Sequence, residues 1–432
     1  MKWLVLLLVI SSRVAFADGS DGSDAAKLGE DRVAAPSYTS GYKDGFVLIA
    51  PDGSSKLYIG TITQFDGRFF ANDNANTEAD QFVFNDIRLD LHGTLFEHYD
   101  FRFLPDFAGG KVVVQDAYVD VRYSNYFKIR VGKLKVPFGL ERLQQDYATT
   151  FAQRGLPNNL VPNRDLGVQL FGEISDGLFA YQVGVFDGVA DGGSSDGDAT
   201  DDKELAARIF VRPFAHGAWW LQNLGVGGAA TFGDKQASIA QPDTPAWKSP
   251  GQQTIFSYKV GATDTLADTV VLDGRTSRAT AQGYWYAGPL GVLSEYVRSI
   301  EHVVLNGTHD RITADAWQVI GQAVLTGDAA TYNSVTPAHP FDPEHGQIGA
   351  IDVVARVGEI RLVDDDALAA GDVDPTKSIR RAWSGSVGAD WYLNRSLRFL
   401  VNYDHTWFRY GAKALGDRPT EDVITGRVQL AF

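Results

Sequence analysis

The 432-residue sequence contains no cysteine. This absence excludes disulfide frameworks, thiolate metal sites and cysteine nucleophiles. Basic residues are also few relative to acidic ones, because 39 Lys and Arg stand against 54 Asp and Glu, which gives a formal net charge of −15. The general basic footprint of a nucleic-acid-binding protein is therefore missing.

Long hydrophobic runs are missing as well. After the first ten residues, no segment approaches the ~20 consecutive apolar residues that a membrane-spanning helix needs. The chain is nevertheless 44% hydrophobic and 12% aromatic, which is too apolar for a disordered protein. These properties leave two classes, a soluble β-rich protein or an outer-membrane β-barrel.

The N-terminus indicates export. Lys2 is followed by eight apolar residues at 3–10, and Ala15-Phe16-Ala17 forms a small-x-small cleavage site. We predict a signal peptide over residues 1–17; a buried N-terminal strand is the alternative. Its removal changes the net charge from −15 to −17. Residues 18–41 begin with an acidic Gly/Ser run and are predicted to be a flexible arm, followed by one domain over 42–432.

Hydrophobicity along this domain has a period of two residues. Ile87, Leu89 and Leu91 alternate with Arg88 and Asp90, and the same alternation recurs over 99–103, 118–123 and 127–131. The polar face carries full charges of both signs, and short turns alternate with long polar stretches at 187–204, 234–252 and 364–379. The chain ends on an alternating strand with Phe432 at its terminus. Together these features favour an all-β transmembrane antiparallel barrel over a soluble sandwich.

The chain length favours sixteen strands, with eighteen as an alternative, and a barrel of this size leaves a water-filled channel. The phase of each strand then assigns basic side chains to the lumen. For each of these bases, a structural ion pair with an acidic residue of the same face is the alternative to a role in anion selection. For Arg88 and Arg122, the ion pair is the favoured interpretation. The predicted lumen-facing basic residues are Arg68, Arg102, Lys128, Arg130, Arg208 and Arg212.

Several segments are more specific than this pattern. The longest is Val131-Gly132-Lys133-Leu134-Lys135-Val136-Pro137-Phe138-Gly139-Leu140-Glu141, and others lie at 106–110, 116–119, 181–188, 325–328, 390–394 and 427–432. In this order they resemble the phosphate-selective porin O/P family over residues 42–432. The resemblance implies a sixteen-stranded homotrimeric outer-membrane channel, an inward-folded third loop at the constriction, and basic side chains that select anions, with phosphate as the expected solute.

The residues at the end of this motif are candidates for the constriction. Lys133 and Lys135 share a strand phase with outward-facing apolar residues, so a straight strand would direct them at lipid, which is costly. A bulge at Gly132, or a strand that turns inward at the interface, would bring them into the pore. We predict that Lys133 and Lys135 line the constriction, with Arg154 and Arg164 on the returning part of the loop.

The functional reading is a passive anion-selective porin of the bacterial outer membrane, without a cofactor, in contact with outer-membrane lipid and not with nucleic acid. A general or cation-preferring porin is the alternative, favoured by the acidic net charge. A barrel enzyme is a remote alternative, because the eight histidines are scattered and neither Gly-x-Ser-x-Gly nor His-Glu-x-x-His occurs.

Overall fold

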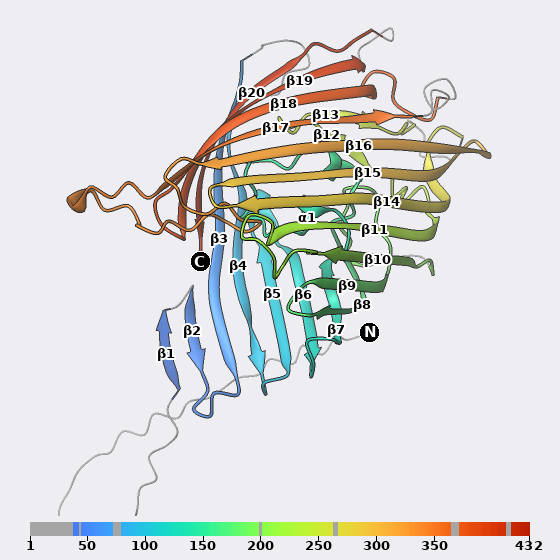
Figure 1. Ribbon diagram of the computed structural model, residues 1–432. Coiled ribbons are helices and arrows are strands. Elements are labelled where there is room, and N and C mark those ends of the chain that lie inside the picture. Colours follow the sequence, from blue (N-terminus) through green and yellow to red (C-terminus); the bar gives the residue numbers. More distant parts are fainter. Residues whose placement is uncertain are drawn as a thin grey trace, which may run out of the picture. The chain divides into compact units, whose positions relative to one another are not determined.

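The computed structural model describes residues 38–42, 45–71, 79–197, 201–261, 267–363, 371–411 and 416–432. Sixteen antiparallel strands form a closed barrel, because β20 (Glu421–Ala431) pairs with β3 (Lys56–Phe70) (Figure 1). The predicted fold class is therefore confirmed. The remaining barrel strands are β4 (Gln81–Leu95), β5 (Tyr99–Asp106), β6 (Val113–Arg122), β7 (Lys128–Lys135), β8 (Arg164–Ile174), β9 (Phe179–Phe186), β10 (Glu204–Val211), β11 (Asn223–Gln236), β14 (Val271–Ala287), β15 (Leu290–Leu305), β16 (Thr308–Val324), β17 (Ala350–Leu362), β18 (Ile379–Tyr392) and β19 (Leu397–Tyr410).

Short elements lie outside the barrel wall. Strands β1 (Thr39–Tyr42) and β2 (Phe46–Ile49) form a hairpin on β3, and β12 (Ala246–Lys248) pairs with β13 (Thr254–Ser257). The helical elements are α1 (Leu140–Leu143) and the 3-10 turns η1 (Ala108–Gly110), η2 (Leu156–Leu160) and η3 (Pro343–His345). No helix in the described ranges is long and apolar enough to cross a membrane.

Alternation along the strands places charges inside the barrel and apolar groups outside. In β4, Asp86, Arg88 and Asp90 are buried, whereas Phe84 and Leu89 are 46% and 37% exposed. Exposed apolar side chains are expected on the outer face of a membrane barrel, where lipid or a partner replaces water. The predicted sorting of the two faces is therefore observed.

The apolar core lies inside the barrel. Phe138 and Leu160 of the β7–β8 connection and Trp247 and Phe256 of the β11–β14 connection pack with inward residues of the β14–β18 wall. The largest core therefore fills one side of the lumen. The cavities described below lie mainly against the opposite arc of strands.

Connection lengths differ from the predicted alternation at two places. Strands β15 and β16 are joined by only Asn306-Gly307, at φ of 52° and 76°, on the side where the other connections are long. Asn-Gly suits this turn, because both positions need a positive φ. On the opposite side, residues 325–349 form a long connection between β16 and β17. We call these two ends of the barrel the loop side and the turn side.

The two chain ends of the barrel domain meet at β3. Backbone groups of Phe432 exchange hydrogen bonds with Thr61, and the Phe432 ring lies 6.1 Å from the rings of Tyr42 and Phe46. The predicted arm over 18–41 differs in its last residues, since 39–41 belong to β1 and pair with β2. The predicted signal peptide, 1–17, lies outside the described residues.

Candidate functional site

The connection between β7 and β8, residues 136–163, folds into the barrel. The Leu140 backbone N–H donates to Glu295 of β15 at 2.7 Å, and Arg398 of β19 donates to the Thr149 carbonyl at 2.7 Å. Gln64 of β3 donates to the Asp146 carbonyl at 3.1 Å. These contacts on widely separated strands show that the third loop on the loop side crosses the lumen, as the resemblance implied.

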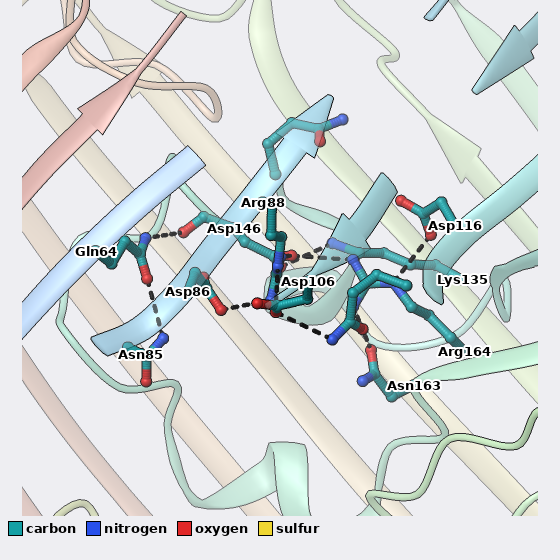
Figure 2. A network of polar contacts seen from close by, with 12 residues as sticks. Gln64, Asn85, Asp86, Arg88, Asp106, Asp116, Lys135, Asp146, Asn163 and Arg164 are labelled. Carbon is teal, nitrogen blue, oxygen red and sulfur yellow. Dashed lines mark hydrogen bonds and ion pairs between the residues drawn. The ribbon is translucent and has the colours of Figure 1, made fainter. Parts of the chain in front are cut away.

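The carboxylate of Asp146 in this loop is surrounded by four cations (Figure 2). Its oxygens lie 3.2 Å from Lys135 Nζ, 2.6 Å from Arg154 Nη2 and 2.9 Å from Arg164 Nη2, and they also pair with Arg88. Burial acts to raise the pKa of Asp146, but the neighbouring positive charges outweigh it and hold the pKa well below its usual range. Asp146 therefore stays ionised at neutral pH.

Other acids complete this network. Arg88 also pairs with Asp86 at 2.6 Å and with Asp106 at 2.8 Å, and Arg164 pairs with Asp116 at 2.9 Å. Figure 2 shows these side chains converging from the strands and from the loop. The network thus joins four cations to four carboxylates, and it links the loop to strands β4 to β8.

Three cavities follow one another past this network. The outer cavity, of about 460 Å³, lies on the loop side and is lined by Asp146, Arg154 and residues of the β11–β14 connection. The middle cavity, of about 250 Å³, is lined by Lys135, Leu143 and Gln145. The inner cavity, of about 390 Å³, shares Gln145 with the middle one and reaches the turn side. Residues 143–146 therefore separate the outer cavity from the middle cavity.

The middle cavity is the most cationic of the three. Its lining includes four basic side chains, Arg102, Arg130, Lys135 and Arg208, against a single acid, Asp116. A narrow space with this balance of charge and low-dielectric walls attracts anions.

Arg208 differs from the other cations of the middle cavity. It hydrogen-bonds to amide oxygens of Gln282 and Gln182, at 3.2 and 3.4 Å, and lies 4.7 Å from the Phe210 ring centre. Within the described part of the chain, Arg208 thus contacts amides and an aromatic ring and forms no ion pair with a carboxylate. Its charge is therefore available to a solute in the cavity.

The inner cavity has the opposite character. Asp90, Asp100 and Asp120 line it, and they pair with Arg102, Arg122 and Arg130 respectively. Asp90 and Asp120 thus line the inner cavity, whereas Arg130 lines the middle cavity and Arg102 lines both. The pairing of Arg122 with Asp100 at 2.8 Å agrees with the sequence-based expectation for this residue.

The structure gathers three of the four predicted constriction residues. Lys135, Arg154 and Arg164 meet on Asp146, whereas Lys133 is buried away from them and pairs with Asp196 of the β9–β10 connection.

Of the six predicted lumen-facing basic residues, three line the middle cavity and three make other contacts. Arg102, Arg130 and Arg208 line the middle cavity. Arg68 lies 3.6 Å from Asp66, Lys128 lies 5.6 Å from the Phe171 ring, and Arg212 donates to the Gly177 and Asp176 carbonyls of a turn.

Gly132 explains how Lys135 reaches the lumen. It adopts a φ of +131°, and a Cβ at this position would lie 2.1 Å from the Ala117 carbonyl oxygen. Arg130 and Lys135, five residues apart, line the same cavity on either side of it. The strict alternation of the strand therefore ends at this glycine, which is the position where the sequence predicted an irregularity.

Two contributors to the site were missed from the sequence. Asp146 lies in a loop without periodicity, so no strand phase could assign it. Tyr332 belongs to the β16–β17 connection, whose first part enters the barrel from the turn side, and its hydroxyl donates to the Leu140 carbonyl at 2.5 Å. The only available signal was the length of that connection.

A closed sixteen-strand barrel with a charged loop across its lumen is the architecture of an outer-membrane porin. The family model for phosphate-selective porin O and P matches residues 56–432, and the chain belongs to this family. Porin O of Pseudomonas aeruginosa is 25% identical over 367 residues, which cover 79% of each chain. The protein is thus a porin of the bacterial outer membrane.

Solved structures share the fold. OmpT of Vibrio cholerae superimposes with a TM-score of 0.55 at 12% identity, over 88% of this chain and 100% of that one. The anion-selective porin from Comamonas acidovorans gives a TM-score of 0.52 at 13% identity, with the same coverage. At these identities the likeness concerns the barrel alone.

Proposed function

We propose that this porin is a passive channel that prefers anions and that phosphate is among its solutes. The observation that supports the proposal is the middle cavity, where Arg102, Arg130, Lys135 and Arg208 face one acid. Guanidinium groups suit phosphate because their planar N–H donors can bind two oxygens at once. The names of the family and of Porin O point to the same class of solute.

The inner cavity supports a second candidate, a general or cation-preferring channel. Its three carboxylates and the net charge of −15 would favour cations near the turn side. We give the middle cavity more weight, because its lining has the largest excess of basic over acidic side chains of the three and it adjoins the loop that crosses the lumen.

The zero-current potential in a planar bilayer under a KCl gradient tests the proposal. The wild-type protein should give the sign set by chloride permeation, and Lys135→Glu/Arg208→Glu should reverse that sign. Arg212→Glu is the matched control, because its guanidinium binds turn carbonyls and does not line any of the three cavities. A cation-selective wild-type channel would contradict the proposal.

Phosphate itself needs a separate measurement. Added inorganic phosphate should reduce the chloride current of the wild-type channel, and the concentration needed for half of this effect should rise at least tenfold in Lys135→Glu. An equal effect of phosphate in both proteins would remove phosphate from the proposal and leave anion preference standing.

A further inference from the structure

The outer face of β15–β19 carries aligned aromatic and arginine side chains. The register pairs Tyr296 with Trp317, and Trp383 with Trp407, with Glu359 between the two pairs. One outward position further toward the loop side, the register aligns Arg298, Asp315, Arg361, Arg381 and Arg409.

These side chains point away from the lumen. Their strand neighbours Val297, Ala316, Ile360, Ala382 and Phe408 belong to the apolar core inside the barrel. The arginine side chains remain accessible, with exposed fractions of 46% for Arg298, 50% for Arg361, 42% for Arg381 and 72% for Arg409. We call these four residues the arginine patch.

Tryptophans give the depth of the patch in the membrane. On β18, Trp383 and Trp391 both face outward, and Gly385, Val387 and Ala389 lie between them. Eight residues of strand span about 27 Å. With the usual strand tilt of ~40°, this is about 20 Å along the membrane normal, close to the ~25 Å of a barrel's apolar band. Because tryptophan favours the two interfaces, Arg381 lies just beyond the apolar band at headgroup depth.

Strand tilt changes the depth along the patch. Arg361 and Arg409 are the neighbours of Arg381 in register and lie near the same interface, whereas Arg298 sits fewer residues from the turn side. A long arginine side chain can still extend toward the headgroups from there. The patch lies on the loop side, which faces the outside of the cell in outer-membrane barrels, so its leaflet is the outer one.

Two buried acids form ion pairs with three of the arginines. Asp315 is 2% exposed and lies 2.6 Å from Arg298 and 3.3 Å from Arg361, and Glu359 is 7% exposed and lies 2.5 Å from Arg381. Asp417 pairs with Arg409 at 2.9 Å. Since each guanidinium has five N–H donors, these pairs position the groups and leave donors directed outward.

We propose that the arginine patch binds the phosphate groups of a phosphorylated outer-leaflet lipid. The charge matches, because the four arginines outnumber the three acids that pair with them, and guanidinium binds phosphate with paired hydrogen bonds. The depth matches, because the patch adjoins the tryptophans that border the apolar band. The lipid chains would then lie along the apolar outer surface of β16–β19, where Val319, Val357 and Val387 line a groove of about 480 Å³.

Native mass spectrometry of the purified porin with added bis-phosphorylated lipid A tests this proposal. We expect Arg361→Gln/Arg381→Gln to reduce the bound lipid at least fivefold. The control Arg275→Gln, an exposed outward residue on β14 outside the patch, should bind like wild type. Dephosphorylated lipid A should bind equally weakly to all three proteins, and 10 mM inorganic phosphate should not displace the phosphorylated lipid.

Each alternative outcome would overturn the proposal. Equal lipid binding by the double variant and wild type would exclude the patch. Equal binding of dephosphorylated lipid would exclude phosphate recognition, and displacement by inorganic phosphate would indicate an ion site. A change in oligomeric state of the double variant would identify the patch as a contact between copies. The variants' heat-modifiable gel mobility checks folding, and their zero-current potential should be unchanged, so this test is independent of the channel's selectivity.

Discussion

At the scale of residues, one carboxylate decides the charge of the constriction. Asp146 pairs with four cations. Among the described residues, Lys135 and Arg154 form an ion pair with no other carboxylate, and Arg164 has one other partner, Asp116. Anions that pass this point compete with Asp146 for the same N–H donors. The carboxylate therefore limits how tightly the pore holds a solute, which a channel needs if the solute is to leave again.

We expect Asp146→Asn to increase the preference for anions, because the substitution removes a negative charge and leaves its cations in place. Asp146 contributes stability above the usual aspartate pKa and loses it only as the pH falls through its depressed pKa. The wild-type carboxylate is thus ionised at both pH 5 and pH 8, and the change in zero-current potential should be of similar size at both.

The matched control for this prediction is Asp176→Asn, which makes the same change of charge in the β8–β9 turn. It should leave the potential as in wild type. If Asp146→Asn shifts the potential at pH 8 but not at pH 5, the carboxylate titrates in that interval and the assigned direction of its pKa is wrong.

The sequence predicted part of this cluster and missed its centre. Lys135 was identifiable because it follows a strand of known phase and an irregular glycine. Asp146 was not, because a loop that crosses the lumen has no repeating face, and its neighbours come from residues 88 to 164. Only the folded chain brings these charges together.

At the scale of elements, the inward loop is held by a second buried acid. Glu141 Oε2 accepts hydrogen bonds from the Gly155 backbone at 2.9 Å, from Asn158 at 2.5 Å and from Gln318 of β16 at 2.8 Å. Two of these bonds fold the loop on itself, and the third joins it to the barrel wall. The loop is therefore part of the packed interior.

We expect Glu141→Ala to release the loop, because three buried donors lose their acceptor. Breaking a buried charged contact of this kind costs about 3–5 kcal/mol. Single-channel recordings should show larger and noisier conductance. Glu344→Ala, in the exposed turn η3, should record like wild type. Quiet openings of wild-type size in Glu141→Ala would show that other contacts suffice to hold the loop.

Strands and connections differ in how well the sequence predicts them. The alternation in β4 specifies both the strand and its inward face, since one period of two encodes both. The 325–349 connection has no such period, and its entry into the barrel depends on Tyr332 meeting the inward loop at Leu140. Contacts between two irregular segments leave no local pattern in either.

At the scale of the whole molecule, the outer face of the barrel has two distinct regions. Phe65, Phe69, Phe82 and Phe84 form an aromatic cluster on β3 and β4, with ring centres 5.1–5.8 Å apart and 37–70% of each residue exposed. The arginine patch occupies β15–β19. A contiguous aromatic surface without charge is typical of protein contacts, whereas tryptophan with arginine is typical of a lipid interface.

We expect the phenylalanine cluster to join protomers in a homotrimer, the state that the family resemblance implies. In Phe82→Asp, light scattering of the purified protein should find less than half of the protein in trimers. The reason is that an aspartate buried without a partner costs several kcal/mol. Phe232→Asp, an equally outward change on β11, should stay trimeric because lipid or detergent covers it. Heat-modifiable mobility should show folded barrels for both. Intact trimers in Phe82→Asp would place the protomer contact elsewhere, and loss of trimer in both variants would indicate a general effect of charge on the outer face.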